Sequence, residues 1–146
     1  MITNFLLGEH AVFYAQFDNL ETGLPEAENL SQVKSLGGML AAALASHAQL
    51  ENELLFSALD PHFGDSGPVA VMRAEHAQIE GTLDQIPAAE DLDQAKRLLM
   101  HTITLARQHF AKEEQVLFPM AQQVLDDQEL FELGAQWAKR RKVLLS

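Results

Sequence analysis

The chain has no cysteine among its 146 residues, which excludes disulfide bonds, iron–sulfur clusters and thiol nucleophiles. Positive charge is also scarce, because 10 Lys and Arg stand against 21 Asp and Glu, for a net charge of −11 at pH 7. Binding to nucleic acid depends on clustered positive charge, so we expect no nucleic-acid partner. No apolar run approaches a membrane-spanning length, and the N-terminal MITNFLLGEHAVF lacks a basic region. We therefore expect no membrane segment, no signal peptide and a cytoplasmic location.

Strand-like patterns are missing too, since β-branched residues are sparse and apolar residues recur every three or four positions. Turn-forming clusters at 22–29, 60–68 and 86–93 separate the periodic segments. The pattern predicts helices at about 4–21, 30–59, 68–85, 90–118 and 128–143. Asn29 and either Asp65 or Ser66 are predicted N-caps, and Pro119 is expected to interrupt the fourth helix.

Short connections favour antiparallel neighbours. We therefore predict one all-α domain over residues 1–146. Residues 4–120 would form an up-down-up-down antiparallel four-helix bundle, followed by a short extra C-terminal helix.

A His-x-x-x-Glu motif occurs three times, as His47/Glu51, His76/Glu80 and His109/Glu113. In a helix this spacing places both side chains on one face, one turn apart. The sequence around these motifs repeats as well: EHAVFY at 9–14 resembles EHAQIE at 75–80, and HAQLENELLF at 47–56 resembles HFAKEEQVLF at 109–118. The chain thus reads as two related helical hairpins, and His10 gives the first helix its own histidine.

The four histidines of these segments fall at about the same height in the predicted bundle, within a turn or so, at about 1.5 Å per residue. Imidazoles and carboxylates inside an apolar bundle are costly unless they are paired or bound to metal. Four histidines and three glutamates are too many for one zinc ion. They suit two redox-capable ions bridged by carboxylates, with iron the first choice and manganese the second.

These motifs, with LF or LFP after the second and fourth, resemble the hemerythrin-like HHE cation-binding domain family over about residues 4–120. The resemblance implies two iron ions with an oxo or hydroxo bridge. It implies His10 and His47 as ligands of one iron, and His76, Glu80 and His109 as ligands of the other. Glu51 and Glu113 would be the bridging carboxylates, and the His10/His47 iron would keep one open coordination position.

The sequence departs from the oxygen-carrying members of that family at two positions. The carriers have a histidine where Glu80 stands, and an extra anionic ligand favours Fe(III), which makes sensing or oxidation chemistry better expectations than reversible O₂ carriage. The carriers also space the last carboxylate one residue further from its histidine, so Glu114 is the alternative bridge to Glu113. Tyr14 has three candidate roles: a phenolate ligand, a hydrogen-bond donor to a bound oxidant, or a packing residue.

Several nearby residues are expected to lie outside the metal site. His62 and His101 are predicted to be ordinary histidines, and Glu53 and Glu75 to be surface charges. An apolar wall around the metal ions is expected from Phe13, Phe56, Phe110, Leu117 and Phe118.

The sequence and the resemblance support three hypotheses about function. The first is a di-iron protein that binds O₂, NO or peroxide as a sensor or handler. The second is a di-iron enzyme with peroxidase-like or oxidase-like activity, and the third is an iron-buffering or iron-sensing module. No oligomeric state, electron donor or protein partner follows from the sequence.

Overall fold

The computed structural model of the chain describes residues 1–64 and 66–145. The described residues form helices joined by short connections, without a strand among them, so the all-α prediction is confirmed. The α-helices are α1 (Ile2–Gly23), α2 (Leu30–Glu51), α3 (Ser57–Phe63), α4 (Pro68–Asp84), α5 (Leu92–Lys112), α6 (Phe118–Val124) and α7 (Asp127–Arg141). A 3₁₀ turn, η1 (Leu24–Glu26), follows α1, and two π-helical segments, η2 (Asn52–Phe56) and η3 (Glu113–Leu117), follow α2 and α5.

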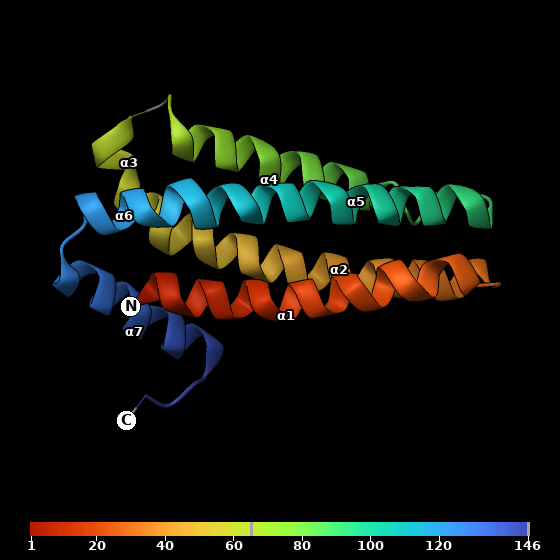
Figure 1. Cartoon of the computed structure of the whole chain (residues 1–146), viewed down its shortest axis with the longest axis horizontal. Helices are drawn as coiled ribbons and strands as arrows, with labels where there is room; N and C mark the ends of the chain where they lie inside the picture. Colours follow the sequence, from red (N-terminus) through yellow and green to blue (C-terminus); the bar gives the residue numbers. More distant parts are fainter. Residues whose placement is uncertain (65, 146) are drawn as a thin grey trace.

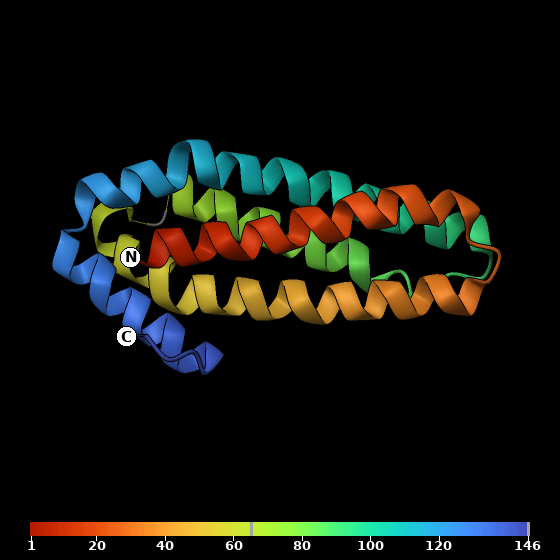
Figure 2. The ribbon, with the colours of Figure 1, turned by 60° about the horizontal axis from the view of Figure 1, so that its bottom comes forward.

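The four long helices α1, α2, α4 and α5 lie side by side along the long axis of the molecule (Figures 1 and 2). Helices α1 and α4 start at the end of the molecule where α2 and α5 run into their π segments (Figure 1). Helix α7 packs on the outside of α1 near the N-terminus. In the part of the chain that the structure describes, no helix is both long and apolar enough to cross a bilayer.

The second and fourth helices run further than the sequence predicted. Both continue without a break through a π segment into a shorter α-helix, to Phe63 and to Val124. The prediction that Pro119 interrupts the fourth helix was therefore wrong. The wider turn of η3 ends at Leu117, two residues before Pro119. A proline ring clashes with the carbonyl four residues earlier in a regular helix, and that carbonyl, of Gln115, lies within the wider turn.

The predicted caps were half right. The Asn29 side chain accepts hydrogen bonds from the backbone N–H groups of Ser31 and Gln32, so Asn29 is the N-cap of α2. The N-cap of α4 is Gly67, and not Ser66, while Asp65 lies outside the described residues. Gly67 has a φ of 123°, which glycine adopts without strain, and the fixed φ of Pro68 then starts the helix.

The core has two apolar clusters, one toward each end of the four long helices. One contains Phe17, Leu40, Leu83 and Ile103, and the other contains Leu6, Leu55, Met72 and Leu117. In α1, α2 and α4, the buried histidine lies between residues of the two clusters. In α5, His109 lies beside Phe110, the last residue of the first cluster in that helix, and Leu117 of the second cluster follows in η3. A polar layer therefore crosses the core, and apolar side chains cover it on both sides.

Candidate metal centre

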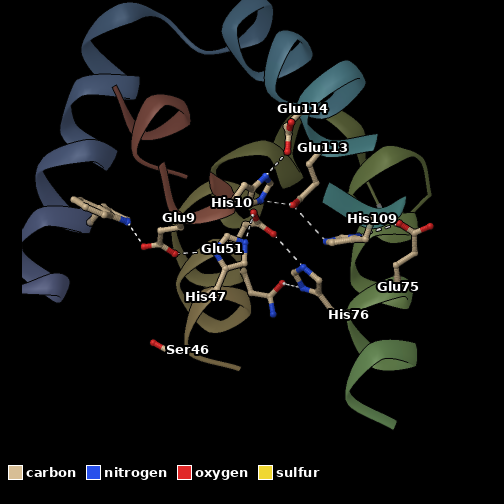
Figure 3. A network of polar contacts seen from close by, with 12 residues as sticks. Glu9, His10, Ser46, His47, Glu51, Glu75, His76, His109, Glu113 and Glu114 are labelled. Carbon is tan, nitrogen blue, oxygen red and sulfur yellow. Dashed lines mark hydrogen bonds and ion pairs between the residues drawn. The ribbon is translucent and has the colours of Figure 1, made fainter. Parts of the chain in front are cut away.

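One buried histidine from each long helix points into this polar layer (Figure 3). His10 comes from α1, His47 from α2, His76 from α4 and His109 from α5, with exposed fractions of 1, 2, 7 and 2%. Glu51, the last residue of α2 before η2, and Glu113, the first residue of η3, are completely buried between them. Because π turns inside α-helices occur frequently at functional sites, their repeated position beside these two carboxylates supports a functional role for the layer.

The six side chains form two groups that share both carboxylates. The first group is His10, His47, Glu51 and Glu113, and the second is His76, His109, Glu51 and Glu113. In each group, one ligand atom per residue lies within 4.8 Å of all the others. Nε2 of His10 is 3.2 Å from Glu113 Oε1, and Nε2 of His76 is 3.0 Å from Glu51 Oε1. Two ligands at right angles, each about 2.1 Å from one ion, would lie about 3.0 Å apart, so the spacing suits a shared metal.

The other ring nitrogen of each histidine is held by a polar side chain. Nδ1 of His10 donates to Glu114 (2.8 Å), Nδ1 of His47 to Glu9 (2.7 Å), Nδ1 of His76 to Asn52 (3.2 Å), and Nδ1 of His109 to Glu75 (3.0 Å). Such a bond fixes the tautomer and the ring orientation, and histidines that ligate metals almost always make one. All four Nε2 atoms are thereby left facing the centre.

These four hydrogen-bond partners follow the internal repeat of the sequence. Glu9 and Glu75 each precede a histidine, whereas Asn52 and Glu114 each follow a buried glutamate. The prediction that Glu75 is a surface charge was wrong, because its side chain is only 20% exposed and bonds to His109. The repeated Glu-His pairs were visible in the sequence, but their significance appears only when neighbouring helices are side by side.

Eight buried atoms in this layer lack a hydrogen-bond partner, counted over the residues that the structure describes. They are the four Nε2 atoms of His10, His47, His76 and His109 and the four carboxylate oxygens of Glu51 and Glu113. Buried polar atoms without partners are costly, and native proteins contain few of them. A set of imidazole nitrogens and carboxylate oxygens that all face one another fits metal ions as the missing partners.

Charge in the metal-free site is balanced by protons. Burial lowers the pKa of His47, but the carboxylates of Glu51 and Glu9 outweigh this effect and raise that pKa to about 9. Burial and the adjacent Glu51 charge raise the pKa of Glu113 well above its ordinary value. Burial and the charge of His47 lower the pKa of His10 to about 4. At neutral pH, His47 therefore holds a proton that a bound metal ion would displace, and the raised pKa of Glu113 favours the same kind of release.

Three further candidates from the sequence lie outside both groups. Glu80 is exposed. The side chain of Glu114 is 29% exposed, and besides His10 it accepts a hydrogen bond from the Tyr14 hydroxyl at 2.7 Å. Burial and the Glu114 carboxylate raise the pKa of Tyr14 far above its ordinary value, which keeps the phenol protonated. His62 and His101 are exposed, away from the polar layer.

Aromatic side chains surround the histidines, as expected of an apolar wall. Phe110 stacks on His10 with ring centroids 3.9 Å apart, and Phe56 stacks on His76 at 5.4 Å. A cavity of about 20 Å³ lies beside the site, lined by His47, His76, His109 and Glu80 among mostly apolar side chains. Its volume has room for one water-sized molecule. Since Ala45 and Glu80 in its lining are exposed, the cavity reaches the surface between α2 and α4.

Four helices that converge on buried imidazoles and carboxylates define a helical protein whose core is suited to hold metal ions. The chain belongs to the hemerythrin family, because residues 1–121 match the hemerythrin HHE cation binding domain. The resemblance predicted from the sequence is thus confirmed. Helix α7 lies beyond the matched residues. Searches of curated proteins and of solved structures found no match.

Proposed function

We propose that α1, α2, α4 and α5 form an up-down-up-down antiparallel four-helix bundle that holds two iron ions, one in each group of ligands. Glu51 and Glu113 would bridge the ions, together with an oxo or hydroxo group. The observation that carries this proposal is the convergence of eight buried atoms without partners from His10, His47, Glu51, His76, His109 and Glu113. Manganese would satisfy the same nitrogen and oxygen donors, so metal content has to be measured.

We further propose that the site binds O₂ or a related small oxidant, NO or peroxide, as a sensor or handler. Bound iron would supply a redox-active centre with room for such a ligand. The adjacent cavity of about 20 Å³ suits a diatomic molecule better than an organic substrate. The phenylalanines against the histidines exclude bulk water, which strengthens electrostatic interactions in the site.

Glu80 is proposed as a ligand that the His76/His109 ion gains by side-chain rotation. It lies one turn beyond His76 and lines the cavity together with His76 and His109, although its side chain is exposed. A Glu80→Gln variant should still bind both ions, because six other ligands are in place. Its oxidised form should be easier to reduce, because an anionic ligand stabilises Fe(III) over Fe(II).

A peroxidase-like enzyme is the second candidate. The Tyr14 hydroxyl donates to Glu114, and Glu114 also accepts from His10, one of the proposed iron ligands. This chain of hydrogen bonds favours the enzyme, because it places a phenolic proton close to the proposed site. Anaerobic reduction, followed by addition of O₂, NO or peroxide in separate samples, distinguishes the candidates. Binding without turnover, seen as a stable change in the visible spectrum, supports the sensor or handler. Catalytic consumption of peroxide supports the enzyme, and a protein that takes up no metal contradicts both.

A further inference from the structure

Glu9 receives more hydrogen bonds than any partner of the other three histidines. Its Oε1 accepts from His47 Nδ1 at 2.7 Å and from Arg141 Nη2 at 3.0 Å. Its Oε2 accepts from Trp137 Nε1 at 2.6 Å and from Arg141 Nε at 2.8 Å. Three of these four donors belong to α7, so the carboxylate that orients His47 is itself held by a helix outside the matched domain.

Arg141 makes a second contact next to the same ligand. Its Nη1 donates to Ser46 Oγ at 2.6 Å, and Ser46 directly precedes His47 in α2. Arginine presents its donors in a planar fork, which can fix a carboxylate in both position and orientation. One side chain of α7 therefore contacts both the hydrogen-bond partner of His47 and the neighbouring turn of α2.

Helix α7 packs closely on α1, and this packing fixes the position from which Trp137 and Arg141 donate to Glu9. A Cβ atom added to Gly134 would lie 3.1 Å from the Phe5 ring and 3.2 Å from the backbone nitrogen of Ile2. Phe5 in turn stacks on Trp137, with ring centroids 4.5 Å apart. The close contact at Gly134 and the stacking of Phe5 on Trp137 thus position α7 so that the Trp137 N–H reaches Glu9.

Among the described residues, the partners of His76 and His109 receive no hydrogen bond from α7. Glu75, the equivalent of Glu9 in the repeat, is held instead by Lys112, whose side chain is 52% exposed. Lys112 lies on α5, one turn beyond His109. Helix α7 therefore holds the hydrogen-bond partner of His47 directly, whereas it donates to neither Glu75 nor Asn52.

We propose that α7 is a positioning element of the metal site, and that its docking and the binding of the ion at the His10/His47 group strengthen each other. Trp137 and Arg141 are the positioning residues, and they act through Glu9 on His47. This inference rests on the proposed function as a metal-binding protein. Because coupling between two binding events is reciprocal, the factor by which docked α7 tightens the ion is the factor by which the ion tightens α7.

Anaerobic titration with Fe(II), followed by calorimetry, tests the first half of the proposal. The wild-type protein should bind two equivalents, and Arg141→Gln should weaken one of them by up to about tenfold, the lower end of the range for removal of a ligand's own hydrogen-bond partner, because Arg141 acts through Glu9. Trp137→Phe keeps the aromatic stack but loses the donor, so it should weaken the same equivalent. Arg141→Lys should restore part of the affinity, because one charged donor remains.

Arg140→Gln is the matched control. Arg140 also ties α7 to the bundle, through an ion pair with the exposed Glu53, but it does not contact Glu9. This variant loses the same charge one position away, and it should change both affinities by less than about twofold. Far-UV circular dichroism should show that all the variants keep the helical content of the wild type.

Amide hydrogen exchange in residues 127–141 tests the second half. Fe(II) should slow exchange there in the wild type and in Arg140→Gln, but much less in Arg141→Gln. The proposal is overturned if Arg141→Gln and Trp137→Phe bind both equivalents as tightly as the wild type does. It is also overturned if both equivalents weaken equally, or if Fe(II) leaves exchange in α7 of the wild type unchanged. A wild-type protein that binds no iron would instead overturn the proposed function.

Discussion

Glu75 accepts a hydrogen bond from Nδ1 of His109 at 3.0 Å, across the contact between α4 and α5. The bond leaves Nε2 of His109 unprotonated and directed at the shared carboxylates whenever the imidazole is neutral. A residue that looked like a surface charge in the sequence therefore orients a buried histidine of the candidate metal site.

Replacing Glu75 should accordingly weaken one metal position. In Glu75→Gln the amide can still accept from His109 but carries no charge, so the imidazole becomes a poorer donor to metal. We expect the affinity of the His76/His109 group to fall by about 10- to 100-fold, measured by Fe(II) titration without oxygen. Glu53→Gln removes an equally charged but exposed carboxylate and should change neither affinity. Equal affinities in Glu75→Gln and the wild type would contradict this role.

Histidine substitutions separate the ligands from the other histidines. His47→Ala and His109→Ala each remove one Nε2 donor and leave a cavity where the imidazole packed. We expect each variant to contain less than the two irons per chain proposed for the wild type. His62→Ala and His101→Ala should keep the full content, because both histidines are exposed. Iron analysis of proteins purified in parallel gives the answer, and four equal values would contradict the assignment.

Much of this site could be predicted from the sequence because the relevant distances are short. A His-x-x-x-Glu spacing fixes both side chains on one helix face, and the buried Glu51 and Glu113 are the result. Each long helix carries one histidine at about the same height in the bundle, and these four histidines meet in the polar layer. The two shared-carboxylate groups divide the histidines as the family resemblance implied.

The remaining features depend on how the helices are rotated against one another. Glu80 has the same spacing from His76 as Glu51 has from His47, yet its side chain is exposed. The π segments also do not follow from a pattern of 3.6 residues per turn. Each wider turn changes which of the following residues face the centre of the bundle. Contacts such as Glu9 with Trp137 join residues 128 positions apart, and no local pattern encodes them.

Glu113→Gln should separate stability from metal binding. In the metal-free protein Glu113 lies buried beside the Glu51 carboxylate, and burial with that charge raises its pKa well above the ordinary value. An amide of the same shape removes the need for this proton, so the metal-free variant should be as stable as the wild type or up to about 2 kcal/mol more stable. Fe(II) at a hundred times its Kd should add about 2.7 kcal/mol per site to the wild type and far less to the variant. Thermal unfolding with and without Fe(II) measures both effects, and unaltered Fe(II) stabilisation would argue against Glu113 as a bridge.

Tyr14→Phe tests whether the phenol reaches a metal ion. The Tyr14 hydroxyl donates to Glu114 and lies outside both groups of ligands, so the iron-loaded wild type should lack an intense phenolate-to-iron band. The variant should then have nearly the same visible spectrum, with at most a modest loss of affinity through the altered Glu114. A strong band in the wild type that disappears in Tyr14→Phe would place the phenolate on the metal.

Metal binding and metal-free stability should depend on pH in opposite ways. The pKa of His47 is raised to about 9 in the folded, metal-free chain, against 6.5 ordinarily, so its contribution to stability is complete below pH 6.5 and disappears as the pH rises through about 9. The raised pKa of Glu113 acts in the same direction.

Metal ions bind the deprotonated forms, so Fe(II) affinity should increase over the same range, by up to about tenfold per pH unit for each proton released. Calorimetry at pH 7 in two buffers of different ionisation enthalpy should detect this release, and His47→Gln should reduce it. If the affinity were the same at pH 6.5 and pH 8.5, then His47 and Glu113 would not both be ligands that hold protons in the free protein.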